Sequence, residues 1–190
     1  MSFVPIADDE DLSDWTSSGY RLLQKKNGFR FSLDAVLLAH FVCEKNNAQI
    51  IDLGCGSGVL PVLLYAYNSS FRLTAVEIQE KYAALARRNM LLNDIPCEIV
   101  NADLRQLPKE WSSQFDAVVA NPPFYPLYTG KLNAAEEINI ARHEICCTLD
   151  DVLRSAKRLL KPRGSLYMIY RPERLDELLS LCRQYELKPH

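Results

Sequence analysis

The sequence predicts an α/β fold, a mostly parallel, twisted sheet with helices on both faces. Short apolar runs alternate with helical segments along the 190 residues. The runs are apolar throughout rather than at every second position, which is typical of parallel strands buried on both faces. A glycine-rich turn, DLGCGSG at 52–58, joins the first run to the helical segment behind it. A chain of this length can hold one domain with a sizeable core.

The expected strands are five short runs with the length and composition of buried strands. They span residues 48–54, 71–77, 97–103, 115–120 and 165–170. The fourth run, FDAVVA, stops at Pro122 and Pro123, which have no N–H to donate to a neighbouring strand. Because helical segments separate most of these runs, we expect the strands to pair in parallel.

The expected helices are amphipathic segments between the strands, together with one that precedes the first strand. They span 30–41, 59–67, 80–92 and 148–160, and a last helix begins at Pro172. Ser32 and Asp34 suit the start of the first helix. Thr148 and Asp151 have the spacing of a capping box. The last helix is expected to bury one apolar face: Leu175, Leu178, Leu179 and Cys182.

Charge and composition set the domain organisation. Residues 21–190 are expected to form one domain, and residues 1–20, which include DDEDLSD at 8–14, an acidic and flexible tail. The net charge of −2 predicts no polyanionic partner by itself. Segment 21–30 nevertheless carries four basic residues and no acid, and segment 154–174 carries seven basic residues against one acid. Such local patches can bind phosphate groups; solvated helix faces explain the second segment equally well and the first segment less well.

The six cysteines show no CxxC pair and no spacing typical of a zinc site, so no metal is expected. The N-terminus lacks the pattern of a signal peptide, and no apolar run approaches the ~20 residues that span a bilayer. We therefore expect a reduced, cytoplasmic protein without a membrane segment.

The glycine-rich turn begins a pattern that points to a nucleoside-containing ligand. Gly54, Gly56 and Gly58 allow a tight turn and a close approach of the backbone to a ligand. Glu77 ends the second strand and Asp103 the third, positions suited to hydrogen bonds with ribose hydroxyls and with an exocyclic amine of adenine. The carboxyl ends of parallel strands converge on one crevice. A purely structural turn remains the alternative for the glycines alone.

The motif NPPF, residues 121–124, follows the fourth strand directly. The side-chain oxygen of Asn121 and the carbonyl of Pro122 could each accept one N–H of a planar amine, and Pro122 and Pro123 would hold these acceptors rigid. Phe124 could stack on a base. An ordinary turn is the alternative reading of these four residues.

Together, DLGCGSG, Glu77, Asp103 and NPPF resemble the class I S-adenosylmethionine (SAM) methyltransferases that modify amino groups. Segments 27–41 and 141–170 are more narrowly similar to the tRNA(Val) adenine-N6 methyltransferase family, within the small-domain methyltransferases; the likeness covers about residues 20–190. The resemblance implies a Rossmann-like fold whose sheet usually ends with two more strands. Those strands are absent after residue 170, so we expect a C-terminally truncated domain.

The resemblance also assigns roles to residues. It implies contacts to SAM from Asp52, Gly54, Cys55, Gly56, Gly58, Glu77, Ile78, Asp103, Leu104, Phe31 and Asp34. Catalysis is assigned to Asn121, Pro122, Pro123 and Phe124, with a tRNA substrate held by Lys25, Lys26, Arg30, Tyr125 and Arg142. Tyr128 and Lys131 are further candidates for RNA contact, and His143 is expected to be structural.

The expected reaction is methylation of the N6 amine of an adenine in tRNA, beside the anticodon of tRNA(Val). Many adenine enzymes carry Tyr where this chain has Phe124, and NPPF also occurs in guanine-N2 methyltransferases. Guanine-N2 in RNA and the amide of a protein glutamine therefore stay open as acceptors. A module that binds SAM or RNA without catalysis is the alternative from another class.

Overall fold

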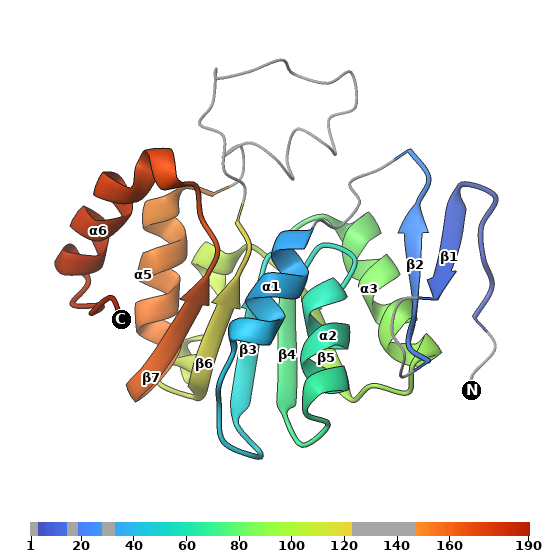
Figure 1. Ribbon diagram of the computed structural model, residues 1–190, viewed down its shortest axis with the longest axis horizontal. Helices are drawn as coiled ribbons and strands as arrows, with labels where there is room; N and C mark the ends of the chain where they lie inside the picture. The colour runs from blue at the N-terminus through green and yellow to red at the C-terminus, as the bar shows by residue number, and fades with distance from the viewer. Residues whose placement is uncertain (1–3, 15–18, 28–32, 123–146) are drawn as a thin grey trace.

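The structure is a computed structural model that describes residues 4–14, 19–27, 33–122 and 147–190 (Figure 1). Its centre is a sheet of five parallel strands in the order β5-β4-β3-β6-β7. The strands are β3 (Gln49–Leu53), β4 (Arg72–Glu77), β5 (Cys97–Asn101), β6 (Phe115–Ala120) and β7 (Leu160–Met168). The predicted parallel α/β sheet is thus confirmed.

Helices cover both faces of this sheet, as predicted. Successive residues of a strand point to opposite faces. Accordingly, Ile50 packs with α1 (Leu33–Phe41), α2 (Val59–Tyr67) and α3 (Glu80–Leu92). Ile51 packs instead with α5 (Leu149–Leu159) on the other face. The last helix, α6 (Leu175–Gln184), contributes to a smaller cluster with α5 and β7.

Several element boundaries differ from the sequence prediction for local reasons. β5 ends at Asn101, because the Asp103 side chain accepts from the Arg105 N–H and begins the 3₁₀ turn η1 (Leu104–Gln106); a second turn, η2 (Lys109–Trp111), follows. β7 begins at Leu160, directly after α5. The capping box of Thr148 and Asp151 is confirmed, whereas the proposed cap Ser32 lies outside the described residues.

The predicted buried face of the last helix is partly wrong. Pro172 begins a 3₁₀ turn, η3 (Pro172–Arg174), before α6. Leu175 is the first residue of α6 and is 49% exposed. Leu178 and Leu181 pack around the buried Cys182 instead.

An N-terminal hairpin replaces part of the expected flexible tail. β1 (Glu10–Asp14) pairs antiparallel with β2 (Arg21–Lys25), and Figure 1 shows this two-stranded unit beside α3. Glu10 is buried at 5% exposure, where its carboxylate accepts hydrogen bonds from Arg88 of α3 at 2.7 and 2.8 Å. Lys25 lies 3.2 Å from the same carboxylate. The acidic run is therefore ordered where basic side chains balance it.

Glu10 should make the free energy of unfolding decrease as the pH falls. The hydrogen bond from Arg88 is the main cause that lowers the pKa of Glu10 to about 2. A lowered carboxyl pKa stabilises the fold above the unfolded pKa of about 4.5, and this contribution is lost as pH falls toward 2. We expect Glu10→Gln to lower the free energy of unfolding at pH 7 by roughly 2 kcal/mol, since Arg88 is partly exposed and screened.

Urea unfolding of the wild type and of Glu10→Gln between pH 2.5 and 7 measures this effect. The variant should lose less stability on acidification than the wild type does. The exposed Asp14 on the same hairpin provides the control, because Asp14→Asn should leave the acid dependence as it is. Parallel acid dependences for the wild type and Glu10→Gln would contradict the assignment.

Candidate functional site

The site predicted from the sequence lies at the carboxyl ends of four adjacent strands. Leu53 of β3 is in register with Val76 of β4 and with Ala120 of β6. The next residues of β3 and β6 are Gly54 and Asn121, so the glycine loop and the NPPF motif begin at the same level of the sheet. Neighbouring strands lie about 4.8 Å apart. The parallel register thus brings the two motifs together, as the sequence analysis proposed.

The loop between β3 and α2 needs glycine for its backbone conformation. Gly54, Gly56 and Gly58 have φ values of 83°, 54° and 82°, in the left-handed region that other residues rarely adopt. The carbonyl of Val76 accepts hydrogen bonds from the N–H groups of Gly54 at 2.9 Å and Cys55 at 3.0 Å. These bonds fix the start of the loop against β4.

The three glycines differ in what surrounds them. A Cβ on Gly58 would lie 3.1 Å from the Cβ of Ala86 and 3.1 Å from the Cε of Met90, both on α3. A Cβ on Gly54 or Gly56 would meet nothing within 4 Å among the described residues. Gly58 therefore permits close packing of the loop on α3, whereas the backbone of Gly54 and Gly56 is open to a ligand.

Glu77, at the end of β4, holds the loop from the side. Its carboxylate accepts from the N–H of Gly56 at 2.9 Å and from the N–H of Gln79 at 2.8 Å. The side chain is 6% exposed, and this burial raises its pKa. A carboxylate has about four acceptor positions. Glu77 can therefore keep both backbone bonds and still accept from ribose hydroxyls.

Asp52 has no hydrogen-bond partner for either carboxylate oxygen among the described residues, although it is 2% exposed. Burial, and to a lesser extent the charge of Glu77, raises its pKa well above the ordinary value. Cys55 is buried nearby, and burial likewise raises the pKa of its thiol. A buried carboxyl without a partner is costly unless a ligand supplies a donor.

Asn121 shows the same feature at the end of β6. Its Oδ1 atom is buried without a hydrogen-bond partner among the described residues. Pro122 is buried next to it. Among the described residues, Asp52 and Asn121 thus place unsatisfied acceptors near the ends of the adjacent strands β3 and β6. SAM carries an ammonium group, ribose hydroxyls and an adenine amine, so this acceptor-rich site fits it chemically.

Asp103 lies after β5, as predicted, but it has a partner that the sequence analysis missed. Arg105 donates to its carboxylate, with a shortest distance of 2.6 Å, and holds the pKa of Asp103 below its ordinary value. The spacing of two residues gave no signal of this pair. Ile78 is 39% exposed beside the site, whereas Leu104 is 8% exposed and packs in the core.

Several other predicted residues can be placed only in part. Asp34 is half-buried in the first turn of α1. The remaining predicted site residues lie outside the described part of the chain: Arg30, Phe31, Pro123, Phe124, Tyr125, Tyr128, Lys131, Arg142 and His143. Their roles stay predictions.

The described residues of the two basic segments, of which Lys25 and Lys26 were predicted to bind RNA, are largely paired with protein groups. Lys25 Nζ lies 2.9 Å from Asp9, and Lys26 Nζ donates to the carbonyl of Asp8 at 2.9 Å. In the second segment, Arg154, Lys157, Lys161, Arg171 and Arg174 form ion pairs with acidic side chains. In the second segment, Asp151, Glu173 and Glu177 lie within three residues of their partners. Asp116 and Glu186 come from distant parts of the chain, and the sequence pattern could not reveal those two pairs.

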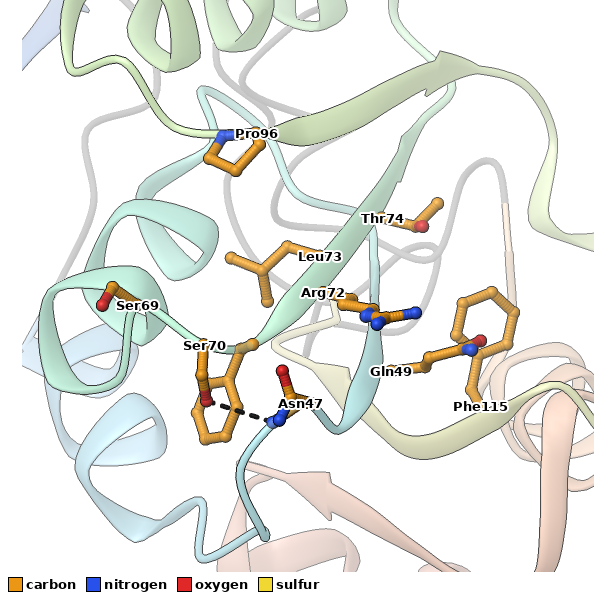
Figure 2. A pocket seen from close by; sticks show the side chains of 10 residues that line it. Asn47, Gln49, Ser69, Ser70, Arg72, Leu73, Thr74, Pro96 and Phe115 are labelled. Atoms are coloured by element: carbon orange, nitrogen blue, oxygen red, sulfur yellow. Dashed lines mark hydrogen bonds between the residues drawn. The ribbon is translucent and has the colours of Figure 1, made fainter.

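A separate hollow of about 400 Å³ lies at the amino ends of β3 and β4, and Figure 2 shows its lining. Gln49, Arg72 and Thr74 line it together with Phe115 and the turn before β4. None of its lining residues belongs to the predicted site. Among the described residues, no helix is long and apolar enough to cross a membrane, and no three potential ligands cluster as a metal site would require.

A parallel sheet of this order, with a glycine loop and acids on successive strand ends, is the architecture of class I SAM-dependent methyltransferases. The family model of the methyltransferase small domain matches residues 32–181. The chain therefore belongs to the methyltransferase small-domain family, and it is a SAM-dependent methyltransferase with SAM as its cofactor. This membership disfavours the alternative of a non-catalytic module.

Curated relatives carry a more specific name. A tRNA1(Val) (adenine(37)-N6)-methyltransferase of Parabacteroides distasonis is 25% identical over 167 residues, covering 86% of this chain and 69% of the relative. One of Shewanella halifaxensis is 29% identical, covering 85% of this chain and 65% of the relative. The chain thus spans about two thirds of the length of these relatives.

Solved structures show the same fold. A protein described as a predicted O-methyltransferase, Atu636 from Agrobacterium tumefaciens, matches with a TM-score of 0.61 and 26% identity, over 78% of this chain and 66% of that one. TrmN from Thermus thermophilus matches with a TM-score of 0.57 and 23% identity, over 77% of this chain and 40% of that one. The latter similarity shows the fold alone.

Asp52 should destabilise the unliganded protein as pH rises. Its raised pKa means that the folded state holds a proton that the unfolded state releases, so stability declines as pH increases above about 4. Asp52→Asn removes this titration. We expect the variant to melt higher than the wild type at pH 8, by about 2–4 °C per kcal/mol gained, and to gain less from added SAM.

Thermal melting between pH 5 and 8, with and without SAM, measures both effects. Asp176→Asn, on the exposed side of α6, is the matched control and should behave as the wild type. An unchanged pH dependence in Asp52→Asn would show that this carboxyl is not the buried titrating group.

Proposed function

We propose that the protein transfers a methyl group from SAM to the exocyclic N6 amine of an adenine in tRNA, beside the anticodon of tRNA(Val). The Oδ1 atom of Asn121, buried and without a hydrogen-bond partner among the described residues, carries this proposal. Ala120, the last residue of β6, pairs with Leu53, the last residue of β3. Asn121 follows Ala120 and Gly54 follows Leu53, so Asn121 lies next to the glycine loop. An acceptor in this position suits an amine that must lie close to the cofactor.

The chemistry requires position more than activation. SAM supplies an electrophilic methyl group, whereas an exocyclic amine is a weak nucleophile because its lone pair is delocalised into the ring. Asn121 Oδ1 and the Pro122 carbonyl would each accept one N–H, favouring the geometry in which the lone pair is localised. The same acceptors would stabilise the positive charge that develops on nitrogen. Holding reactants in this way can contribute about 7–11 kcal/mol.

The other strand ends would hold the cofactor. Within the described part of the chain, Gly54 and Gly56 have open backbone, Asp52 has an unsatisfied acceptor, and Glu77 has spare acceptor positions for ribose. Arg105 makes four hydrogen bonds to the Asp103 carboxylate, so Asp103 would receive the adenine amine on acceptor positions that it shares with Arg105. These assignments give each polar group of the site a role in binding or in amine positioning.

The acceptor base is the finer part of the proposal. The names of the curated relatives support adenine-N6 of a tRNA(Val), and they place the modified base at position 37 of those substrates. The same two acceptors suit the N2 amine of guanine in RNA or the amide of a protein glutamine, so these stay as competing outcomes. A tRNA substrate would place the protein in the cytoplasm.

Replacement of Asn121 should separate binding from chemistry. We expect Asn121→Ala to bind SAM as the wild type does and to lose methyl transfer by about 100-fold or more, the usual effect of removing one preorganised polar partner. Asn121→Asp keeps an acceptor oxygen and should retain more turnover than the alanine variant. Calorimetric SAM titration and single-turnover transfer measure the two properties. Full turnover in Asn121→Ala would show that NPPF is an ordinary turn without a catalytic role.

The substrate can be identified directly. Incubation of the protein with labelled SAM and unmodified bulk tRNA, followed by nucleoside mass spectrometry, should yield N6-methyladenosine. The sample without protein is the control. A label in N2-methylguanosine would change the proposed base to guanine. If tRNA stays unlabelled and a parallel incubation with a protein extract labels glutamine, the proposed substrate class would change to protein.

A further inference from the structure

Asn89 of α3 joins the N-terminal hairpin to the glycine loop. It is 0% exposed, and its side chain makes three hydrogen bonds. Its Oδ1 accepts from the N–H of Leu23 at 2.7 Å, and its Nδ2 donates to the carbonyl of Leu23 at 3.0 Å. The same Nδ2 donates to the carbonyl of Ser57, inside the loop, at 2.8 Å. One buried amide therefore contacts β2 and the loop at once.

Asn93, one helical turn later, makes a similar pair of bonds to the hairpin and none to the glycine loop. Its Oδ1 accepts from the N–H of Arg21 at 2.9 Å, and its Nδ2 donates to the carbonyl of Arg21 at 2.8 Å. Nδ2 also donates to the backbone carbonyl of Asn89 at 2.7 Å. Asn93 caps the end of α3 and is half-buried, and its side-chain bonds do not include the loop.

The two side-chain amides hydrogen-bond the backbone of β2 on the side that faces away from β1, as a neighbouring strand would. Alternate residues of a strand turn their backbone groups to opposite sides, so Arg21 and Leu23 face α3. Two residues of a strand span about 6.7 Å, and four residues of a helix about 6 Å. Side chains four apart on α3 therefore match backbone groups two apart on β2. The hairpin therefore packs on α3 because the two elements have nearly the same spacing between these hydrogen-bonding groups.

We infer that Asn89 is a positioning residue for the cofactor, which fixes the glycine loop through the Ser57 carbonyl and couples the loop to the N-terminal hairpin. The loop is already held by Val76 and Glu77 on one side. Asn89 holds it on the α3 side, next to the close contact of Gly58 with Ala86 and Met90. A loop fixed before the ligand arrives loses less conformational freedom on binding. The inference rests on this loop being part of the SAM site.

The pair Asn89 and Asn93 supplies a matched experiment. SAM dissociation constants are measured by calorimetry on the full chain for the wild type, Asn89→Ala and Asn93→Ala. Melting without ligand and hydrogen exchange of residues 54–58 are measured on the same samples. Both variants should melt below the wild type, since each loosens the hairpin. Only Asn89→Ala should weaken SAM binding, by about tenfold, and speed amide exchange in the loop.

The outcomes separate the inference from the function on which it rests. Equal losses of SAM affinity in the two variants, or unchanged loop exchange in Asn89→Ala, would overturn the positioning role. A wild type that fails to bind SAM would instead count against the site itself. If Asn89→Ala does not fold, Asn89→Leu fills a similar volume without the hydrogen bonds and takes its place, with the same expected result.

Discussion

The parallel pairing of β3 with β4 on one side and β6 on the other is the constraint on which the rest depends. All strands of a parallel sheet run in the same direction, so their carboxyl ends, and the loops that follow them, lie at the same end of the sheet. That geometry alone brings together residues 52–58, Glu77 and Asn121. A slip of one residue in either pairing would turn Asp52 or Glu77 to the opposite face.

The sheet and the main helices follow from the sequence because their signals are local. FDAVVA, residues 115–120, coincides with β6, and the amphipathic segments 59–67 and 80–92 coincide with α2 and α3. Motif spacing likewise predicted the turn at the glycine loop and the strand ends that carry Glu77 and Asn121, and the roles of these residues stay predictions. In each case the residues that define the feature are near neighbours in the chain, so periodicity and turn chemistry suffice.

The features that escaped prediction depend on distant partners. The hairpin forms because Glu10 meets Arg88 and because Asn89 and Asn93 complete the hydrogen bonds of β2, pairs more than 60 residues apart. Its acidic sequence therefore indicated a solvated tail. The Asp103–Arg105 pair was missed for a different reason, since it depends on the turn η1, which forms only after β5 ends. A run of charged residues in the sequence does not reveal which of them form ion pairs in the fold.

The open backbone at Gly54 and Gly56 has a consequence for how the site tolerates change. The N–H groups of Gly54 and Gly56 are already bonded to Val76 and Glu77, so what the loop leaves open is the space where a Cβ would stand. That space depends on the left-handed conformation of the glycines and not on the identity of the small side chains between them. Cys55 and Ser57 are free to vary among small residues, while a single Cβ at a glycine would change the shape of the whole loop.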